Sequence, residues 1–293
     1  MEIMASNIAL FKKYIGLLDE VYQVESKTAG LESSKDLARD GANANEIIIP
    51  KISMDGLANI DRAGGGKYVA GNVSLVMETV KFNFDRGRQF LVDAMDDEET
   101  AGVAFGQLAG EFIRTKVVPE LDAFRFAKYA ELAGTAQTGA IADGAAFLTA
   151  LVNATTALDD AEVPESERYL FATPTLINAI MCLNTTESRE ILDKFAAITK
   201  VPQARFYTAI EQKDGTTAGE EAGGYAKATA GKDINFMIIH KPALMQYTKH
   251  KVTKIFSPDQ VQDADGWKFN FRAYGLADVY ENKVMGVYLH NKE

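Results

Sequence analysis

The sequence predicts a mixed α+β protein in which an extended β-hairpin and a long helix accompany a compact α/β unit. Three observations support this fold class. Two β patterns flank a Gly-rich tip between residues 46 and 84, a helical stripe runs over residues 98–132, and helices alternate with strands over residues 140–250. The 293 residues are 47% hydrophobic and 25% charged, which is typical of a globular chain with a sizeable core.

Composition excludes several classes of protein. The net charge of −10 argues against a protein whose main task is to coat nucleic acid. No run of about 18 consecutive apolar residues is available to span a membrane, and the first residues do not resemble a secretory signal. The single cysteine, Cys182, excludes an internal disulfide framework and a cysteine-based zinc site. We expect its thiol to be buried and inert, between Met181 and Leu183.

The first 45 residues predict a helix followed by an arm. Apolar residues from Phe11 to Tyr22 recur at steps of three and four, which indicates an amphipathic helix. The stretch 26–45 is polar and contains glycines. We therefore expect it to be an arm outside the core.

The segment 46–84 predicts two long strands around a flexible tip. Ile47 to Ile49 begin the first strand, and residues 73–84 form the second, with Gly64 to Gly66 in the tip between them. A two-stranded hairpin is marginal in water because it buries little on itself. It must therefore lie on another part of the protein or on another chain.

The longest predicted helix covers residues 98–132. It begins with the acidic run Asp96 to Glu99, which suits a helix N-terminus, and its apolar stripe continues to Leu132. A helix of this extent is about 50 Å long at about 1.5 Å per residue. Pro119 lies inside it and should kink it or split it after about residue 115.

The rest of the chain predicts an α/β unit and a closing β segment. Asp143 is expected to cap a helix that buries Phe147, and Thr173 with Pro174 is expected to begin another. A third helix is expected over residues 188–195. Strands are predicted over 169–172, 204–210, 235–240, 251–256, 267–273 and 284–289, with a polar Gly-rich loop over 211–233.

No sequence motif predicts a catalytic, cofactor-binding or metal-binding residue. The run from Gly224 to Lys232 has six residues between its glycines and an acid after its lysine, so it does not match a phosphate-binding loop. His240, His250 and His290 form no metal-ligand pattern, and His240 is expected to be a packed or capping side chain. Pairs of acids lie at helix ends or in polar loops, where solvation explains them.

The order of these elements resembles that of the major capsid proteins of tailed bacteriophages, which have the Hong Kong 97-like fold. The local resemblance lies in Phe82 to Phe90 (FNFDRGRQF), the helix from Phe112 to Leu132, and the end of the chain. That end comprises Tyr274 to Tyr280 (YGLADVY) and Lys283 to His290 (KVMGVYLH). The resemblance covers nearly the whole chain.

The resemblance implies a division into five parts. In this family the extended loop lies over a neighbouring subunit, and the axial domains meet at the centre of each hexamer or pentamer. Some relatives join a lysine to an asparagine of another subunit. Lys67 lies in the loop tip, but no partner is identified, so no crosslink is predicted. The implied parts are an N-terminal arm (1–45), an extended loop (46–90), a peripheral domain with the spine helix (91–134 and 251–280), an axial domain (135–250), and a closing strand with the C-terminus (281–293).

The function that the resemblance implies is structural and not enzymatic. It is a coat protein that self-assembles as hexamers and pentamers into an icosahedral shell around double-stranded DNA. Its implied partners are further copies of itself, a portal protein, a scaffolding protein and decoration proteins, with packaged DNA nearby but not specifically bound and no membrane. Its implied location is the virion, after assembly in the host cytoplasm.

Two alternatives remain open at this point. An encapsulin-like shell protein of a bacterial compartment resembles the same fold but encloses enzymes. A hydrolase built on the α/β unit belongs to a different class, and it predicts a clustered polar pocket formed from residues 140–250.

Overall fold

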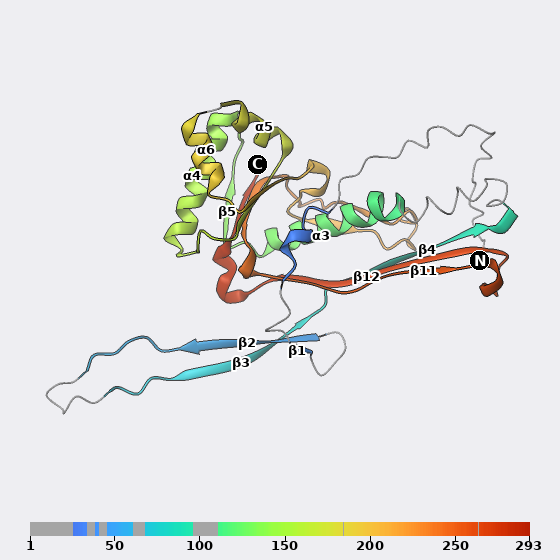
Figure 1. Cartoon of the computed structure of the whole chain (residues 1–293), viewed down its shortest axis with the longest axis horizontal. Helices are drawn as coiled ribbons and strands as arrows, with labels where there is room; N and C mark the ends of the chain where they lie inside the picture. The colour runs from blue at the N-terminus through green and yellow to red at the C-terminus, as the bar shows by residue number, and fades with distance from the viewer. Residues whose placement is uncertain are drawn as a thin grey trace.

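The computed structural model describes residues 26–33, 39–40, 46–60, 68–95, 111–183, 185–262 and 264–293. Within them a compact lobe adjoins a long three-stranded sheet, and a hairpin projects in the direction opposite to that sheet (Figure 1). The helix predicted from Phe11 to Tyr22, the acidic run from Asp96 to Glu99, and the loop tip with Gly64 to Lys67 lie outside the described residues.

The compact lobe is a five-stranded sheet covered on both faces. Its strands are ordered β5-β13-β10-β6-β7, with β10 antiparallel to both of its neighbours and the outer pairs parallel. One face packs on three helices through Phe236 and Ile238, and the other contributes Met237 and Ile239 to the main core beside α3. The elements are β5 (Thr135–Thr138), α4 (Gly144–Asp160), β6 (Arg168–Ala172), α5 (Pro174–Leu183), α6 (Thr186–Asp193), β7 (Ala197–Lys200), β10 (Ile234–His240) and β13 (Val287–Asn291).

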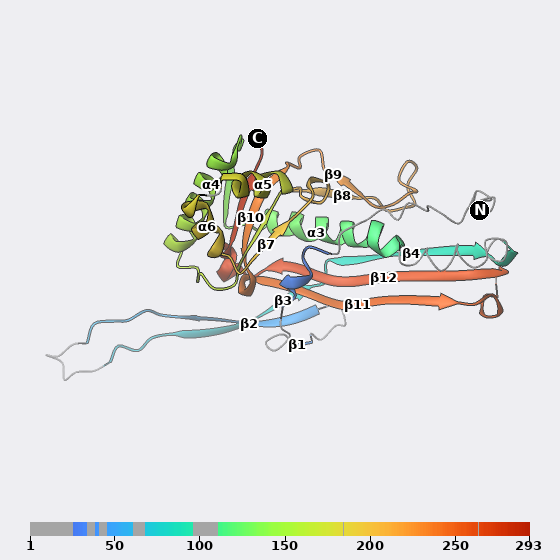
Figure 2. The same cartoon turned by 45° about the horizontal axis from the view of Figure 1, so that its top comes forward.

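The long sheet carries the predicted spine helix on one of its faces. It consists of β11 (Leu244–Phe256), β12 (Gly266–Val279) and β4 (Phe84–Asp93), ordered β11-β12-β4 and antiparallel throughout. The helix α3 (Val118–Glu131) lies over it, as the two views in Figures 1 and 2 agree. Phe84 of β4 contacts Phe124 of α3 at a ring separation of 5.0 Å, so this face of the sheet belongs to the main core.

The hairpin is formed by β2 (Glu46–Met54) and β3 (Val73–Lys81), which pair along their full length. The short β1 (Arg39–Asp40) pairs with the base of β2. At this base the side chains of Ile47, Ile49 and Val80 pack on the long sheet, against Met245, Tyr247 and Leu276. Those sheet residues alternate with the ones that face α3, so the hairpin base lies on the opposite face of the sheet.

Short elements connect these parts. They include a small hairpin formed by residues 210–212 and 225–227. A loop was expected over residues 211–233. The elements are the 3₁₀ turns η1 (Ala29–Leu31), η3 (Gln203–Arg205), η4 (Lys241–Ala243), η5 (Pro258–Gln260) and η6 (Glu281–Gly286), together with the strands β8 (Ile210–Gln212) and β9 (Tyr225–Lys227). No helix of the described part is both long enough and apolar enough to cross a membrane.

Several sequence predictions are confirmed. The Asp143 side chain accepts a hydrogen bond from the backbone N–H of Ala146, at 2.8 Å, and so caps α4. Pro174 begins α5 as expected. The predicted pairing of the two hairpin strands is present, although it ends at Lys81. Residues 84–93 turn away to pair with β12, because alternate side chains such as Phe84 and Val92 are buried there.

The strand predicted over 204–210 is wrong. Residues 203–205 form a 3₁₀ turn instead, and the strand begins only at Ile210. Both Arg205 and Phe206 are buried, although neighbouring residues of a strand would point to opposite faces. Phe206 packs edge-on against Phe126 of α3, at a ring separation of 4.9 Å, so a tertiary contact overrides the local β pattern.

Pro119 changes the helix without ending it. The five residues before α3, Ile113–Val117, form a π-helix that continues into α3. A proline has no N–H to donate to the preceding turn, and an inserted π turn is one way to accommodate the loss. The helix is therefore continuous through residue 115, and its irregular turn lies where the sequence predicted a kink or a split.

Two expectations about burial are also wrong. Cys182 is exposed, because α5 buries Leu176, Ile177 and Ile180 and these lie on a different face of the helix. Residues 26–33, which were expected to be part of an arm outside the core, contain the buried Thr28 and Leu31. Leu31 belongs to the main core, so this part of the polar stretch is an integral element of the fold.

Candidate interaction surface

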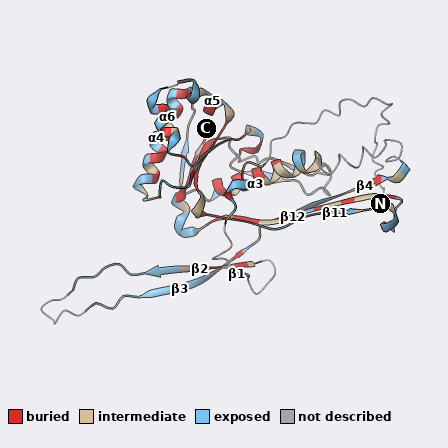
Figure 3. Cartoon of the chain, in the orientation of Figure 1, coloured by how far each residue is buried: buried red, intermediate tan, exposed pale blue. Residues whose placement is uncertain are grey.

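The outer part of the β2–β3 hairpin has one continuous apolar face. Residues that are paired across an antiparallel ladder share a face, and Ile52 pairs with Leu75 while Met54 pairs with Val73. With Met77, these five side chains form what we call the apolar hairpin face. They are between 49% and 71% exposed, and Figure 3 shows the outer hairpin as exposed along its length.

The opposite face of the hairpin has a different character. Near the body it carries the buried Ile47, Ile49 and Val80. Farther out it carries the pair Lys51 and Val76 and then the pair Ser53 and Ser74, so only Val76 is a large apolar residue there. The outer hairpin is therefore amphipathic, with its apolar face turned to solvent.

The apolar character continues toward the tip. Leu57, Ile60, Tyr68 and Val69 are all exposed. The strands stay together beyond the ladder, because Asp55 and Asn72 exchange two hydrogen bonds. The backbone N–H of Asp55 donates to the Asn72 carbonyl at 3.1 Å, and the backbone N–H of Asn72 donates to Asp55 Oδ2 at 2.7 Å.

Polar and aromatic contacts join the root of the hairpin to the body. Asn83 lies between β3 and β4, and its side-chain amide forms two hydrogen bonds with the backbone of Ala277, as a neighbouring strand would. Its Nδ2 donates to the Ala277 carbonyl at 2.7 Å, and its Oδ1 accepts from the Ala277 N–H at 3.1 Å. The Phe82 ring packs on Tyr274 at 4.8 Å. An ion pair joins Lys51 to Glu281, and this hydrogen bond raises the pKa of Lys51.

The three histidines lie on different elements and form no site. His240 ends β10, where burial lowers its pKa. His290 lies in β13 beside Phe236, with its Nδ1 3.1 Å from Asn235 Nδ2, and burial lowers its pKa also. His250 is exposed on β11. In the described ranges no group of three His, Cys, Asp or Glu side chains could hold a metal ion.

The Gly-rich run and the acid pairs have structural roles. Lys227 of β9 pairs at 2.7 Å with Asp233, which directly precedes β10. Asp159, at the end of α4, pairs with Arg168 at 2.7 Å. In the acid pair Glu220 and Glu221, Glu220 Oε2 accepts from the Asp214 N–H at 3.1 Å and Glu221 Oε2 accepts from the Gly219 N–H at 3.0 Å.

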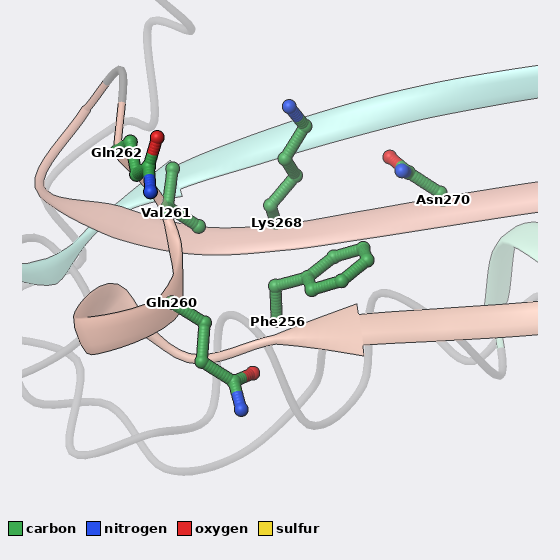
Figure 4. A pocket seen from close by; sticks show the side chains of 6 residues that line it. All are labelled: Phe256, Gln260, Val261, Gln262, Lys268 and Asn270. Atoms are coloured by element: carbon green, nitrogen blue, oxygen red, sulfur yellow. The ribbon is translucent and has the colours of Figure 1, made fainter.

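A hollow of about 270 Å³ lies at the far end of the long sheet (Figure 4). It is outside the segment 140–250, where the hydrolase hypothesis placed its polar pocket. The Oδ1 atom of Asn270 is buried beside it and has no hydrogen-bond partner in the described part of the chain. The lining residues are Phe256, Gln260, Val261, Gln262, Lys268 and Asn270.

Solved structures share this fold over nearly the whole chain. A structure of Mycobacterium phage Che8 matches with a TM-score of 0.65 at 14% identity, covering 98% of each chain. The mature capsid of bacteriophage PhiM1 matches with a TM-score of 0.66 at 10% identity, covering 96% of this chain and 91% of that one. A virus-like particle from Pyrococcus furiosus matches less well, with a TM-score of 0.50 at 10% identity and coverage of 82% and 86%.

No protein-family model and no curated protein sequence matches the chain. The likeness therefore lies in the arrangement of the elements, which the order of helices and strands in the sequence already indicated. The chain has the fold of tailed-phage capsid proteins.

Proposed function

We propose that this chain is the major capsid protein of a tailed bacteriophage. It self-assembles as hexamers and pentamers into an icosahedral shell that encloses double-stranded DNA. The observation that carries the proposal is the apolar hairpin face, defined by Ile52, Met54, Val73, Leu75 and Met77, which projects away from the body of a chain with a capsid fold.

A further copy of the same chain is the partner that fits this face best. A contiguous exposed apolar surface marks an interaction site, and a two-stranded hairpin gains stability only when something covers it. The long sheet offers a partly uncovered face on the side where the hairpin base packs. Along its outer part the exposed or half-exposed side chains include Leu91, Phe256 and Tyr274. A hairpin lying on such a face of the next copy would repeat around a ring, and many weak contacts would sum to a stable shell.

The domain division supports the same role. We assign the compact lobe to the axial domain, the long sheet with α3 to the peripheral domain, and the hairpin to the extended loop. The net charge of −10 suits a container, because a wall that does not attract phosphates lets DNA enter and leave. The chain acts as a structural and not a catalytic protein in the virion, assembled in the host cytoplasm with a portal, a scaffolding protein and decoration proteins.

Electron microscopy of the purified full-length chain tests the proposal. We expect rings and closed shells of uniform size, and particles from infected cells should contain double-stranded DNA. A chain that stays monomeric over a wide range of protein and salt concentrations would contradict the proposal. Shells filled with a cargo enzyme would support the encapsulin-like alternative instead, which the lower similarity to the Pyrococcus furiosus particle makes the weaker one.

A deletion of residues 58–68 tests the assignment of the extended loop. The deleted segment lies beyond the paired strands β2 and β3, so the subunit should fold nearly as before. Shell assembly should be impaired. If the variant assembled normally while its monomer unfolded, the loop assignment would be wrong.

A further inference from the structure

The carboxylate of Asp122 on α3 is completely buried and holds the segment that precedes the hairpin. Three consecutive residues, Ser26 to Thr28, donate to it. Its Oδ1 accepts from the Ser26 hydroxyl at 2.6 Å, from the Thr28 hydroxyl at 2.7 Å and from the Thr28 N–H at 3.3 Å, while its Oδ2 accepts from the Lys27 N–H at 2.8 Å. A buried carboxylate is stable only when such donors surround it.

The same carboxylate also binds the turn η3, which follows strand β7 of the compact lobe. Arg205, in the turn η3 between β7 and β8, donates from Nη1 to Asp122 Oδ2 at 3.3 Å, and both side chains are almost fully buried. A second arginine reinforces the arrangement from α3, because Arg125 Nη1 donates to the Thr28 hydroxyl at 2.8 Å. Asp122 is therefore a junction of three parts of the chain: the segment 26–33, α3 and the turn η3.

The remainder of the segment is fastened to β11. The Ser33 N–H donates to the Gln246 carbonyl at 3.0 Å, and the Gln246 N–H donates back to the Ser33 hydroxyl at 3.1 Å. The Gln246 side chain donates to the Thr28 carbonyl at 2.9 Å and accepts from the buried Tyr129 hydroxyl of α3 at 2.8 Å. The Leu31 side chain packs in the main core. The segment is thus held at both ends.

We propose that residues 26–33 act as a clasp, and that seating this clasp on Asp122 fixes the turn η3, at the edge of the compact lobe, against α3. When the clasp leaves, Asp122 loses the four hydrogen bonds that the clasp donates, whereas its 3.3 Å ion pair with Arg205 stays in place. A buried charge with too few partners is costly, so the junction must rearrange or admit water. Displacement of the clasp is therefore transmitted across Asp122 to the turn η3. The inference concerns the subunit alone and is independent of whether it forms a shell.

Hydrogen exchange on the full-length chain tests the coupling. The variant Ser26→Ala with Thr28→Val removes both hydroxyl donors and keeps the backbone. Amides of residues 26–33 should exchange roughly tenfold faster, because buried hydrogen bonds that hold this segment are lost. Amides of residues 203–212, on the other side of Asp122, should also exchange faster. Amides of β6 and β10 should keep their rates. The control Thr138→Val removes a hydroxyl that bonds to Asn291 Oδ1 at 2.9 Å elsewhere in the lobe, and it should leave residues 203–212 unchanged.

A second variant tests the same coupling from the side of Arg205, in case the first does not fold. Arg205→Lys keeps the charge but shortens the reach to Asp122, and because coupling acts in both directions it should accelerate exchange in residues 26–33. Two results would overturn the proposal. One is faster exchange in the clasp with residues 203–212 unchanged. The other is an equal acceleration of all amides, including β10, which would indicate global unfolding and not a coupled junction.

Discussion

The compact lobe and the hairpin contain the same kinds of residue, but these residues are buried in the lobe and exposed in the outer hairpin. Both are rich in β-branched and other large apolar side chains. In the lobe, Phe236 and Ile238 have no exposed surface, because helices and sheet from the same chain cover them. In the hairpin, Leu75 and Ile52 are more than half exposed, because nothing in the described part of the chain lies over them.

Hydrophobic surface therefore has two roles in this chain: it stabilises the subunit in the lobe and is available to a partner in the outer hairpin. Burial within the chain stabilises the subunit, whereas apolar surface left in solvent stabilises the subunit only after a partner covers it. The root of the hairpin marks the boundary between the two, since Ile49 is buried against the long sheet while Ile52, three residues along, is not. Substitutions on either side of this boundary should therefore affect different measurements.

The largest effect on the subunit should come from the lobe. Phe236 packs against Phe147 and His290, at ring separations of 5.4 Å and 5.1 Å, so Phe236→Ala should lower the free energy of unfolding by about 3–5 kcal/mol. Leu75→Ala in the hairpin should change it by less than about 0.5 kcal/mol. Urea denaturation of the unassembled subunit measures both. Equal losses would contradict the separation of the two regions.

A smaller effect should arise at the boundary itself. Ile49→Ala removes a buried side chain from the cluster with Tyr247 and Leu276, and should cost about 2 kcal/mol at the hairpin root. Amides of β2 and β3 near the root should then exchange faster. The matched variant Ile52→Ala lies on the same strand but in solvent, and it should leave those amides unchanged. Protection that is lost equally in both variants would show that the root is not the fastening point.

The lobe should also lose stability in mild acid. Burial lowers the pKa of His240 and of His290 below the ordinary value of about 6.5, so the fold favours their neutral forms. The unfolded chain takes up protons first as the pH falls below about 6.5. The stabilisation is therefore complete above that pH and is lost as the pH falls through the folded-state pKa values.

Thermal unfolding between pH 7 and pH 5.5 measures this dependence. The double variant His240→Gln with His290→Gln should show a shallower decline in Tm than the unmodified chain. Most carboxyl groups titrate below this window. Burial raises the pKa of Asp278, but this contribution is common to both chains and has the opposite sign, because the folded state then favours the protonated form. An unchanged decline in the double variant would contradict the assignment to these histidines.

The smallest effect should come from the ion pair at the hairpin root. Lys51 and Glu281 are both well exposed, and water and salt screen the attraction between exposed charges. Lys51→Met should therefore leave the free energy of unfolding nearly unchanged, and added salt should remove any difference that is measured. A large or salt-independent loss would contradict the assignment of this ion pair to the solvent-screened surface.

Sequence reasoning succeeded where structure is local. The cap of Asp143, the helix start at Pro174 and the presence of each hairpin strand depend on residues within a few positions of one another. It failed where distant contacts decide. The burial of Phe206 against Phe126 and the pairing of β4 with β12 join residues that are far apart in the chain, and no local pattern reports them.

The candidate surface was predicted only in part. The alternation of residues indicated a hairpin that needs cover, but the division of its outer part into an apolar and a polar face follows from the register of Ile52 with Leu75. The junction at Asp122 was missed entirely. Its donors lie about 95 positions away, in a polar stretch whose composition resembles a free arm. A buried acid on a helix is not distinguishable in sequence from a solvated one.

One pair of variants tests the central claim that the apolar hairpin face is needed for shell assembly and not for folding of the subunit. Leu75 and Val76 are neighbours on β3, are 56% and 54% exposed, and lie on opposite faces. Leu75→Glu and Val76→Glu should both give folded subunits with nearly unchanged unfolding. Sedimentation velocity with electron microscopy should then show shells for Val76→Glu and only small oligomers or monomers for Leu75→Glu. Shells of normal yield from both variants would contradict the claim.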